Sequence, residues 1–527
     1  MDVYQMTTKS EGMMILGKLK WYTILALALW LAFSGMAAAE QLYVNESGWW
    51  RVDGAFNASG APIQAAVDNA TAGEMICVAA GSYTENVNVD KPRLTLEGEG
   101  GDVVTVTAAN SGDHVFEVTA DYVNISMFTV TGAASFMYAG IYLDGVDHCN
   151  IYENNCSNNG RGICLESSSD NTLANNTANS NNICGICLFC SSYNTLESNT
   201  MSGNAWNFGV FGYSLSEYTQ NIDTSNTVDG KSIYYWVDQK DWQIPSNAGF
   251  VGVVNGTNIT VRDLTLTDNW KGVLFAYTEN SRIENVTVSS NYDGICLHSS
   301  SNNTLASNTA LDNYDGVALD DSSNNTLVSN TANSNNDDGI QLDDSSNNTL
   351  VSNTANSNKE EGIQLSFSSN NTLVSNTANS NNDRGIRLYK SSSNLIYNNY
   401  FNNTRNAYDD GSNHWDSGSV GNYYSDYNGA DLDGDGIGED SYSIPGGESI
   451  DRFPLMHPWT GDTPQKGDLN GDGKLTPADV AIALQIAVGS RPCDPTTLAA
   501  ADVSGDNRIT SLDALMILQA ADHAIDL

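Results

Sequence analysis

Aliphatic residues recur at a fixed interval through the middle of the chain. A Gly-Ile/Val-x-Leu segment repeats every 22 or 23 residues, starting at Gly294, Gly316, Gly339, Gly362 and Gly385. An Asn-Thr-Leu segment keeps the same period, with its leucines at Leu305, Leu327, Leu350 and Leu373. A period in the twenties is typical of stacked structural units that share one core. These repeats lack the 3.6-residue spacing of an amphipathic helix, so each unit is predicted to consist of short strands.

The units are predicted to be coils of a right-handed parallel β-helix, an all-β solenoid. Each coil is too polar to form a core alone, so its aliphatic side chains must stack on those of the next coil. At the strand spacing of about 4.8 Å, Ile340 would lie on Ile363. Asparagine suits the corners, because it tolerates left-handed backbone and its amide pairs with the next coil. Leucine-rich repeats need more leucines in each unit, and a disordered Asn/Ser tract would not keep the anchors in register.

Weaker signals extend the β-helix in both directions. The Gly-Ile-x-Leu signature also starts at Gly140, Gly162 and Gly185. Residues 40–135 are predicted to hold an N-terminal cap and the first coils, with a short helix from Ile63 to Val67 over the open end. Residues 136–459 are predicted to complete the β-helix, with an aromatic insertion at about 210–271 and a closing cap at about 400–459. The insertion is interpreted as a longer coil or a hairpin against the side of the β-helix; its clustered rings are Tyr234, Tyr235, Trp236 and Trp242.

Residues 1–39 have the features of a signal peptide. Lysines precede an apolar run from Trp21 to Phe33, and Ala37-Ala38-Ala39 offers a cleavage site. An uncleaved anchor ending at Ala39 is the alternative, although the run is short for a membrane span. We therefore expect a secreted or cell-surface protein with no membrane span after cleavage.

The net charge of −41 limits the partners. So acidic a chain would repel nucleic acid and anionic lipid, whereas it suits divalent cations. Asn-x-Ser/Thr sequons could carry glycans in an exported protein, although the repeated Asn-Asn-Thr segments also fit the steric needs of the corners. The sequons considered begin at Asn45, Asn124, Asn255, Asn285, Asn302, Asn324, Asn347 and Asn370.

Beyond a linker at residues 460–466, residues 467–527 contain two calcium-type loops 34 residues apart. Calcium takes six to eight oxygen ligands, and a twelve-residue loop supplies them at fixed positions. The first loop offers Asp468, Asn470, Asp472, the Lys474 carbonyl, Thr476 and Asp479. The second loop offers Asp502, Ser504, Asp506, the Arg508 carbonyl, Thr510 and Asp513. One helix is predicted after each loop, roughly from Ala478 to Val488 and from Leu512 to Ala521.

This duplicated loop–helix unit resembles a type I dockerin, since no helix precedes Asp468 and each loop ends in Asp rather than Glu. The resemblance implies two bound calcium ions and a cohesin-domain protein as partner. It also places partner contacts at loop positions 10 and 11, which here are Pro477, Ala478, Ser511 and Leu512. The two pairs differ, so the two halves need not bind equivalently. A calcium-stapled tail without a partner is the alternative.

Residues 60–459 resemble the NosD-like family of secreted β-helix proteins, and the start of this region also resembles pectin esterases. The resemblance rests on the opening from Ala61 and on the closing stretch from Gly411 to Trp459. The family is named for a role in copper-site maturation, but copper needs clustered His, Met or Cys, and the six histidines are scattered. Within the closing stretch, Asp431, Asp433 and Asp435 form half of a calcium loop and suggest a third calcium ion, although Tyr442 stands where the last acidic ligand would be.

Cysteines suggest pairing rather than a metal site. Cys164 and Cys187 occupy the same outward position in successive coils, so they are predicted to form a disulfide or to stack as free thiols. Cys149 and Cys156 could form a local bridge. Zinc or copper at the Cys184, Cys187 and Cys190 cluster is a weaker alternative.

Carboxylates also repeat at fixed positions in the coils. They predict an acidic flank that is solvated or binds cations, made of Asp315, Asp338, Glu361, Asp320, Asp343, Asp321 and Asp344. We expect a non-enzymatic protein that contacts glycan or cell envelope and is anchored through the dockerin-like domain. A polysaccharide hydrolase or lyase recruited to a cohesin scaffold is the alternative, since paired carboxylates support acid/base catalysis. No residue can be assigned a catalytic role, because the repeats are nearly identical.

Overall fold

The computed structural model describes residues 41–432, 436–458, 466–467, 469, 475–488, 498, 500–504 and 508–521. The predicted signal peptide and residues 460–465 of the predicted linker lie outside the described residues. Within the described part of the chain, no helix has the length and apolar character needed to cross a membrane.

The predicted parallel β-helix is confirmed. In the repeat region, β36 (Ile340–Asp343) pairs in parallel with β38 (Ile363–Ser366), which pairs with β41 (Ile386–Tyr389). Ile340 lies opposite Ile363 and Leu342 opposite Leu365, and all four side chains are fully buried. The glycine before each strand is needed for close packing: a Cβ at Gly316 would lie 2.5 Å from the Gly339 carbonyl oxygen. The period of the sequence therefore reflects coil-on-coil stacking.

Buried asparagines form ladders that run along the β-helix. In one ladder the side-chain amide of Asn330 donates to Asn353 Oδ1 (2.9 Å), and that of Asn353 donates to Asn376 Oδ1 (3.0 Å). The series continues to Asn422, whose amides donate to the buried carboxylate of Asp451. Because a carboxylate only accepts, it terminates a chain of donors that all point towards the C-terminus. Burial raises the pKa of Asp451 to about 6.

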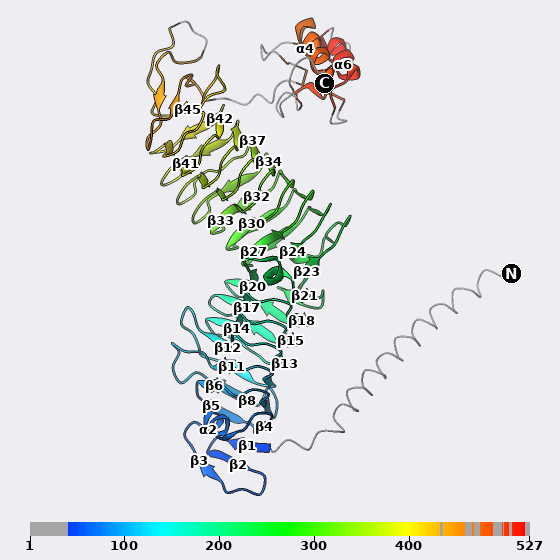
Figure 1. The fold of residues 1–527 in the computed structure, drawn as a ribbon, viewed down its shortest axis with the longest axis vertical. Helices are drawn as coiled ribbons and strands as arrows, with labels where there is room; N and C mark the ends of the chain where they lie inside the picture. Colours follow the sequence, from blue (N-terminus) through cyan, green and yellow to red (C-terminus); the bar gives the residue numbers. More distant parts are fainter. Residues whose placement is uncertain are drawn as a thin grey trace, which may run out of the picture.

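The β-helix has two halves that meet at a bend, visible near β24 (Ala248–Val254) in Figure 1. A tight hairpin joins β22 (Thr227–Val228) to β23 (Lys231–Val237) and reverses the chain, with left-handed backbone at Asp229 and Gly230. Strands β23 and β24 then start the second half as members of its sheet. The predicted insertion is therefore not a hairpin on the side of the β-helix. Outward side chains such as Phe250 pack into the core cluster of the first half, so the bend is closed by apolar contact.

Caps cover both ends of the β-helix. At the N-terminal end, α2 (Pro62–Asn69) buries Ile63 and Val67 as predicted. Its free backbone N–H groups are satisfied by the buried carboxylate of Glu85, which accepts from Ile63 and Gln64. At the other end, the closing cap carries the hairpin of β46 (Tyr442–Ser443) and β47 (Ile450–Asp451), together with the fully buried Trp415 and Tyr424.

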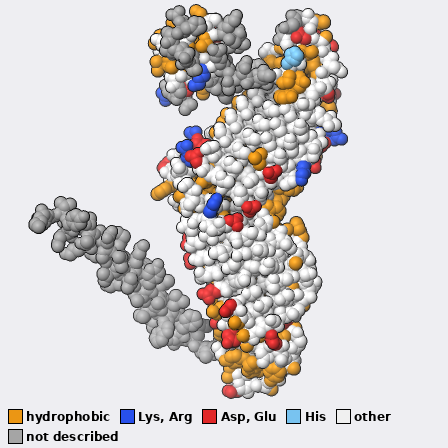
Figure 2. Space-filling view, turned by 180° about the vertical axis from the view of Figure 1, so that it is seen from behind, with side chains coloured by type: hydrophobic (Ala, Val, Ile, Leu, Met, Phe, Trp, Pro, Cys, Tyr) orange, Lys and Arg blue, Asp and Glu red, His pale blue; other side chains and the backbone are white. Residues whose placement is uncertain are grey.

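Uncharged polar side chains and backbone dominate the face of the rod that Figure 2 shows. Figure 2 shows mostly white atoms along the middle of the rod, with hydrophobic side chains gathered at the end that holds the N-terminal cap. The described part of the C-terminal region is instead helical: α4 (Pro477–Ala487) and α6 (Ser511–Ala521) pack around Ala483, Ala514 and Ile517. The two folds thus adjoin in sequence but differ in class.

Candidate functional site

The second calcium-type loop is closed by the side chain of its last acidic residue. Asp513 is fully buried; its Oδ1 accepts the N–H of Ser504 at 3.0 Å and its Oδ2 accepts the N–H of Thr510 at 2.8 Å. Burial opposes ionisation, but these hydrogen bonds lower the pKa of Asp513, so the carboxylate is charged. The Ser504 hydroxyl also donates to Asp502, so hydrogen bonds link four predicted ligands of this loop.

The first loop repeats this arrangement. Asp479 is fully buried; its Oδ1 accepts the N–H of Leu469 at 2.8 Å and its Oδ2 accepts from Thr476. Five predicted ligands lie outside the described residues: Asp468, Asn470, Asp472, Lys474 and Asp506. Of the second loop, Arg508 is described and exposed.

The described donor set fits calcium. Calcium is held by hard oxygen ligands, and the described side chains of both loops offer carboxylate and hydroxyl oxygens, from Asp479, Thr476, Asp502, Ser504, Asp513 and Thr510. The two buried carboxylates already tie the end of each loop to its beginning. A bound cation would add charge neutralisation to a loop that is otherwise rich in negative charge.

Next to the loops, the helices expose apolar side chains. Leu512 is half exposed, and Pro477 and Ser511 are also exposed; Ala478 lies in the first turn of α4. The exposed fractions of further helix residues are large, at 76% for Val488, 50% for Leu515, and 43% for each of Leu484 and Leu518. The described part of the C-terminal region thus leaves several aliphatic side chains open to solvent.

The acidic loop of the closing cap is only partly described. Asp431 Oδ2 accepts the N–H of Gly436 at 3.0 Å, whereas Asp433 and Asp435 lie outside the described residues. Tyr442 belongs to the cap itself, because its ring stacks on Tyr424 and its hydroxyl donates to Asp426.

The predicted acidic flank is two different columns. The column before each glycine is buried rather than solvated: Asp293, Asp315, Asp338 and Glu361 are each less than 9% exposed. It starts at Lys271, which pairs with Asp293, and ends at Arg384, which pairs with Glu361 at 3.1 Å. Burial and the neighbouring carboxylates raise the pKa of Asp315 to about 7 and also raise the pKa of Asp338 and Glu361. The other column, with Asp320, Asp321, Asp343 and Asp344, is at least partly exposed.

A histidine–carboxylate pair lies where the two halves meet. His298 Nδ1 is 2.8 Å from Asp320 Oδ2, while His298 Nε2 is buried without a hydrogen-bond partner in the described structure. The ring of His298 lies against Tyr218 of α3 (Leu215–Tyr218) and against Tyr277. No motif in the sequence indicated this pair, because His298 is the variable residue that follows a Gly-Ile-x-Leu segment.

The clustered rings at 234–242 divide between core and surface. Tyr235 is buried and its hydroxyl donates to the Tyr218 carbonyl, so it packs within the bend. Tyr234 and Trp236 are half-buried, and Trp242 is 62% exposed with its ring 6.3 Å from that of Trp236. Of these four rings, Trp242 is the most exposed and therefore the most accessible to a ligand.

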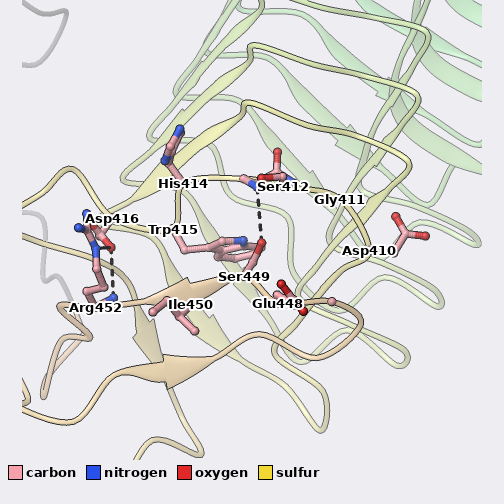
Figure 3. Close-up of a pocket in the computed structure, with 12 residues that line it drawn as sticks. Asp410, Gly411, Ser412, His414, Trp415, Asp416, Glu448, Ser449, Ile450 and Arg452 are labelled. Atoms are coloured by element: carbon pink, nitrogen blue, oxygen red, sulfur yellow. Dashed lines mark hydrogen bonds and ion pairs between the residues drawn. The ribbon is translucent and has the colours of Figure 1, made fainter.

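A polar cavity of about 660 Å³ opens in the closing cap. It lies between the segment 410–416 and the hairpin segment 447–452, as Figure 3 shows. Its wall carries His414, Asp410 and Glu448, and an ion pair between Asp416 and Arg452 crosses one side. Trp415 is fully buried beneath it and donates to Asp409, so the cavity lacks an open aromatic floor.

The predicted cysteine pairings, Cys164 with Cys187 and Cys149 with Cys156, are both wrong. Cys164 and Cys187 do lie opposite each other in neighbouring coils, but Cys187 is bonded to Cys184, and Cys164 is a free thiol. Both positions point away from the core yet are buried, because the ring of Trp270 and its neighbours cover them. Cys149 and Cys156 are free and buried as well.

The family comparison agrees with this architecture. A model described as periplasmic copper-binding protein (NosD) matches residues 67–249 and 226–429, which together exceed half of the chain. The chain belongs to the NosD family. A model described as dockerin type I domain matches residues 466–520, which confirms the predicted dockerin module. Dockerin domains bind calcium and have cohesin domains as their partners.

The NosD β-helix also resembles solved structures, at low similarity. The A-module of a mannuronan C-5 epimerase from Azotobacter vinelandii is 14% identical, with a TM-score of 0.30, covering 69% of this chain and 95% of that one. A periplasmic alginate epimerase is 13% identical (TM-score 0.24; 71% and 83% covered), and so is an alginate lyase from Paenibacillus (TM-score 0.24; 56% and 92% covered). No protein of curated function matches the sequence.

Within the part of the chain that the structure describes, the clustered side chains do not fit copper. Among the described residues, the clustered candidate ligands are three carboxylates, Glu360, Glu361 and Asp383. Arg384 pairs with Glu361 and Asp383, and Arg405 also pairs with Asp383. Copper prefers nitrogen and sulfur ligands, so this cluster does not suit it.

Proposed function

We propose that this protein is a secreted or cell-surface β-helix that contacts carbohydrate or cell envelope, and that its dockerin domain fixes it in an extracellular assembly. Calcium would fill the two dockerin loops, held by the twelve ligands predicted from the sequence. The partner would be a cohesin-domain protein, which contacts Pro477, Ala478, Ser511 and Leu512.

One observation carries this proposal: exposed aliphatic side chains next to two cation-binding loops in a very acidic chain. Leu512 is the eleventh residue of the second loop and lies in the first turn of α6, and Leu515 and Leu518 lie further along the same helix. An apolar patch with a polar rim is the usual anatomy of a protein–protein interface. Calcium would stabilise the loops from which both helices start, so binding of cohesin should require it.

Binding of the full chain to a cohesin module from the same organism tests the proposal. We expect binding with calcium and none with a chelator. Asp472→Ala combined with Asp506→Ala should abolish binding, because each change removes a ligand from the centre of a loop. Asp431→Ala, which removes a carboxylate from the closing cap, is the matched control and should bind normally. Binding without calcium, or by the double variant, would contradict the proposal.

The carbohydrate contact is proposed to use ring stacking at Trp242. Tryptophan offers a flat apolar face with a polar edge, which suits a sugar ring. Trp242→Ala should keep the fold, since the side chain is mostly exposed, and should reduce retention on a polysaccharide column. Tyr235 is buried and is not part of this surface. Unchanged retention of the Trp242→Ala variant on the column would exclude ring stacking at Trp242 as the carbohydrate contact.

A polysaccharide hydrolase or lyase is the second candidate. It is favoured by the carboxylates of raised pKa in the buried column, since perturbed titratable groups are typical of catalytic sites. The hydrogen-bonded pair of His298 with Asp320 offers a second acid/base arrangement. Incubation with acidic and neutral polysaccharides should then release reducing ends or unsaturated products. Absence of both products across such a panel would leave the non-enzymatic function.

A third calcium ion is proposed for the closing cap, with Asp431, Asp433 and Asp435 as ligands. Its support is the acidic spacing together with the hydrogen bond from Gly436 to Asp431. Counting the bound calcium ions in the purified protein distinguishes three sites from two.

A further inference from the structure

The repeated Asn-Asn-Thr segments use their two asparagines differently. The second asparagine is buried in a ladder along the β-helix, as at Asn303, Asn325, Asn348 and Asn371. The first is exposed at a corner where the backbone is left-handed, with φ between 57° and 61°, as at Asn302, Asn324, Asn347 and Asn370. The strands that follow pair in register from coil to coil, so these four asparagines lie one above another. The fold therefore uses the second side chain for its core and leaves the first at the surface.

The exposed amides have little structural role. Those of Asn324, Asn347 and Asn370 make no hydrogen bond within the described part of the chain, and that of Asn302 donates only to the adjacent Ser301. Other sequon asparagines are engaged in the fold: Asn285 donates to Asp263 at 2.7 Å, and Asn255 donates to Asp238 at 2.6 Å. The four corner sequons thus combine exposure, available amide nitrogen and regular spacing.

We propose that Asn302, Asn324, Asn347 and Asn370 are N-glycosylation sites that carry a stripe of glycans along one corner of the rod. The donor would be a lipid-phosphate-linked oligosaccharide, met during export. The amide nitrogen forms a bond to the anomeric carbon, the bond from that carbon to the phosphate oxygen breaks, and the amide proton leaves with the lipid phosphate. Each sequon supplies the required hydroxyl residue at its third position, from Thr304, Thr326, Thr349 and Thr372.

The spacing of the four sites determines how close together the glycans would stand. Coils repeat at about 4.8 Å, so glycans on successive coils would stand close enough to form a continuous hydrated ridge. Asp321 and Asp344 are exposed and stand three residues before Asn324 and Asn347, so the ridge of glycans would lie beside carboxylates. It would cover one corner and leave the outer face of the neighbouring sheet open.

Mass spectrometry of peptides from the full chain, exported by its native organism, tests the proposal. The test variant changes all four threonines to valine, a residue of similar shape that cannot complete a sequon. The matched control changes the same four threonines to serine, which keeps every sequon. Sugar-sized mass increments should appear on the corner peptides of the unaltered chain and of the serine variant, and should vanish from the valine variant.

Two results would overturn the proposal: unmodified corner peptides in the exported unaltered chain, or increments that persist in the valine variant. If the fourfold valine variant fails to fold, single variants replace it. Thr326→Val should then remove the increment from the peptide containing Asn324 alone and leave the other three peptides modified. Loss of increments from all four peptides at once in such a variant would also contradict independent sites.

Discussion

The asparagine ladders of the β-helix and the calcium-type loops of the dockerin domain satisfy their buried polar groups in opposite ways. In the β-helix, neutral amides such as those of Asn330 and Asn353 pair with one another, so donor and acceptor come from the same rod. In the dockerin domain, the buried polar groups include the carboxylates Asp479 and Asp513, which accept hydrogen bonds but bring negative charge into acidic loops. From this difference we expect that the β-helix holds its shape alone, whereas the dockerin domain depends on a cation.

Calcium removal should give the largest effect, confined to one side of this comparison. Metal binding to such loops is coupled to folding, because unneutralised carboxylates repel one another. We expect a chelator to abolish the helical circular dichroism of the dockerin domain and to leave the β signal of the rod. Re-addition of calcium is the control and should restore the helical signal. Loss of both signals, or of neither, would contradict the comparison.

A charge placed between coils should break the rod and spare the dockerin domain. Leu342 is fully buried, so Leu342→Asp would bury an unpaired carboxylate and cost several kcal/mol, roughly 3 or more. The adjacent Gln341 is only half-buried, and Gln341→Ala should cost under about 0.5 kcal/mol. Denaturant unfolding followed by the β signal measures both. Equal costs for the two variants would contradict the inward assignment of Leu342.

The two regions should respond to pH with opposite slopes. In the rod, the folded pKa of Asp315 is raised, to about 7, so stability is greatest below about pH 4 and falls as pH rises towards 7, by about 1.4 kcal/mol per unit of pKa shift. In the dockerin domain, the pKa of Asp513 is lowered, so its contribution is present above about pH 4 and is lost below it. Unfolding of the two regions across pH 3–8 measures both slopes.

A neutral variant of the buried column sharpens the pH comparison. Asp315 faces Asp293, Asp337, Asp338 and Lys271. Asp315→Asn removes the titrating group at nearly unchanged volume, so the rod's stability should fall less steeply between pH 4 and 7. An unchanged slope would show that the column does not control the pH dependence.

The amide ladder should give a smaller effect. Asn353→Ala removes a buried amide that links Asn330 to Asn376 and leaves their groups unpaired, which costs about 1–3 kcal/mol. Asn336 is exposed and lies outside this ladder, so Asn336→Ala is the matched control, at under about 0.5 kcal/mol. Thermal unfolding of the rod measures the melting temperature of each variant. A similar decrease in both variants would show that the ladder does not stabilise the rod.

Much of this architecture was predictable because the residues that face inward are the ones that recur at the repeat period. Ile340, Leu342 and the strand glycines recur in the sequence as they stack in the fold. The bend itself was not predictable, because Tyr234 to Trp242 interrupt the period and sequence spacing does not tell which sheet a strand joins. The pair of His298 with Asp320 was also missed, since only the register between β30 (Asp293–His298) and β33 (Asp315–Asp320) brings them together. Likewise, Asp338 and the equivalent carboxylates of neighbouring coils are buried, although acidic residues are almost always exposed unless they are paired.

The direction of the amide ladders has a consequence for how long the rod can be. In the second half of the β-helix, the coils from Asn308 to Asn399 each pass the same amide donor to the next coil, and the last asparagine of this ladder, Asn422, donates to Asp451. A coil of 23 residues inserted after Asn376 would meet the same partners on both faces, and the terminating carboxylate would be unchanged. Each insertion would lengthen the molecule by about 4.8 Å without requiring a new interface. The distance between the N-terminal cap and the closing cap is therefore a quantity that gene duplication can adjust one coil at a time.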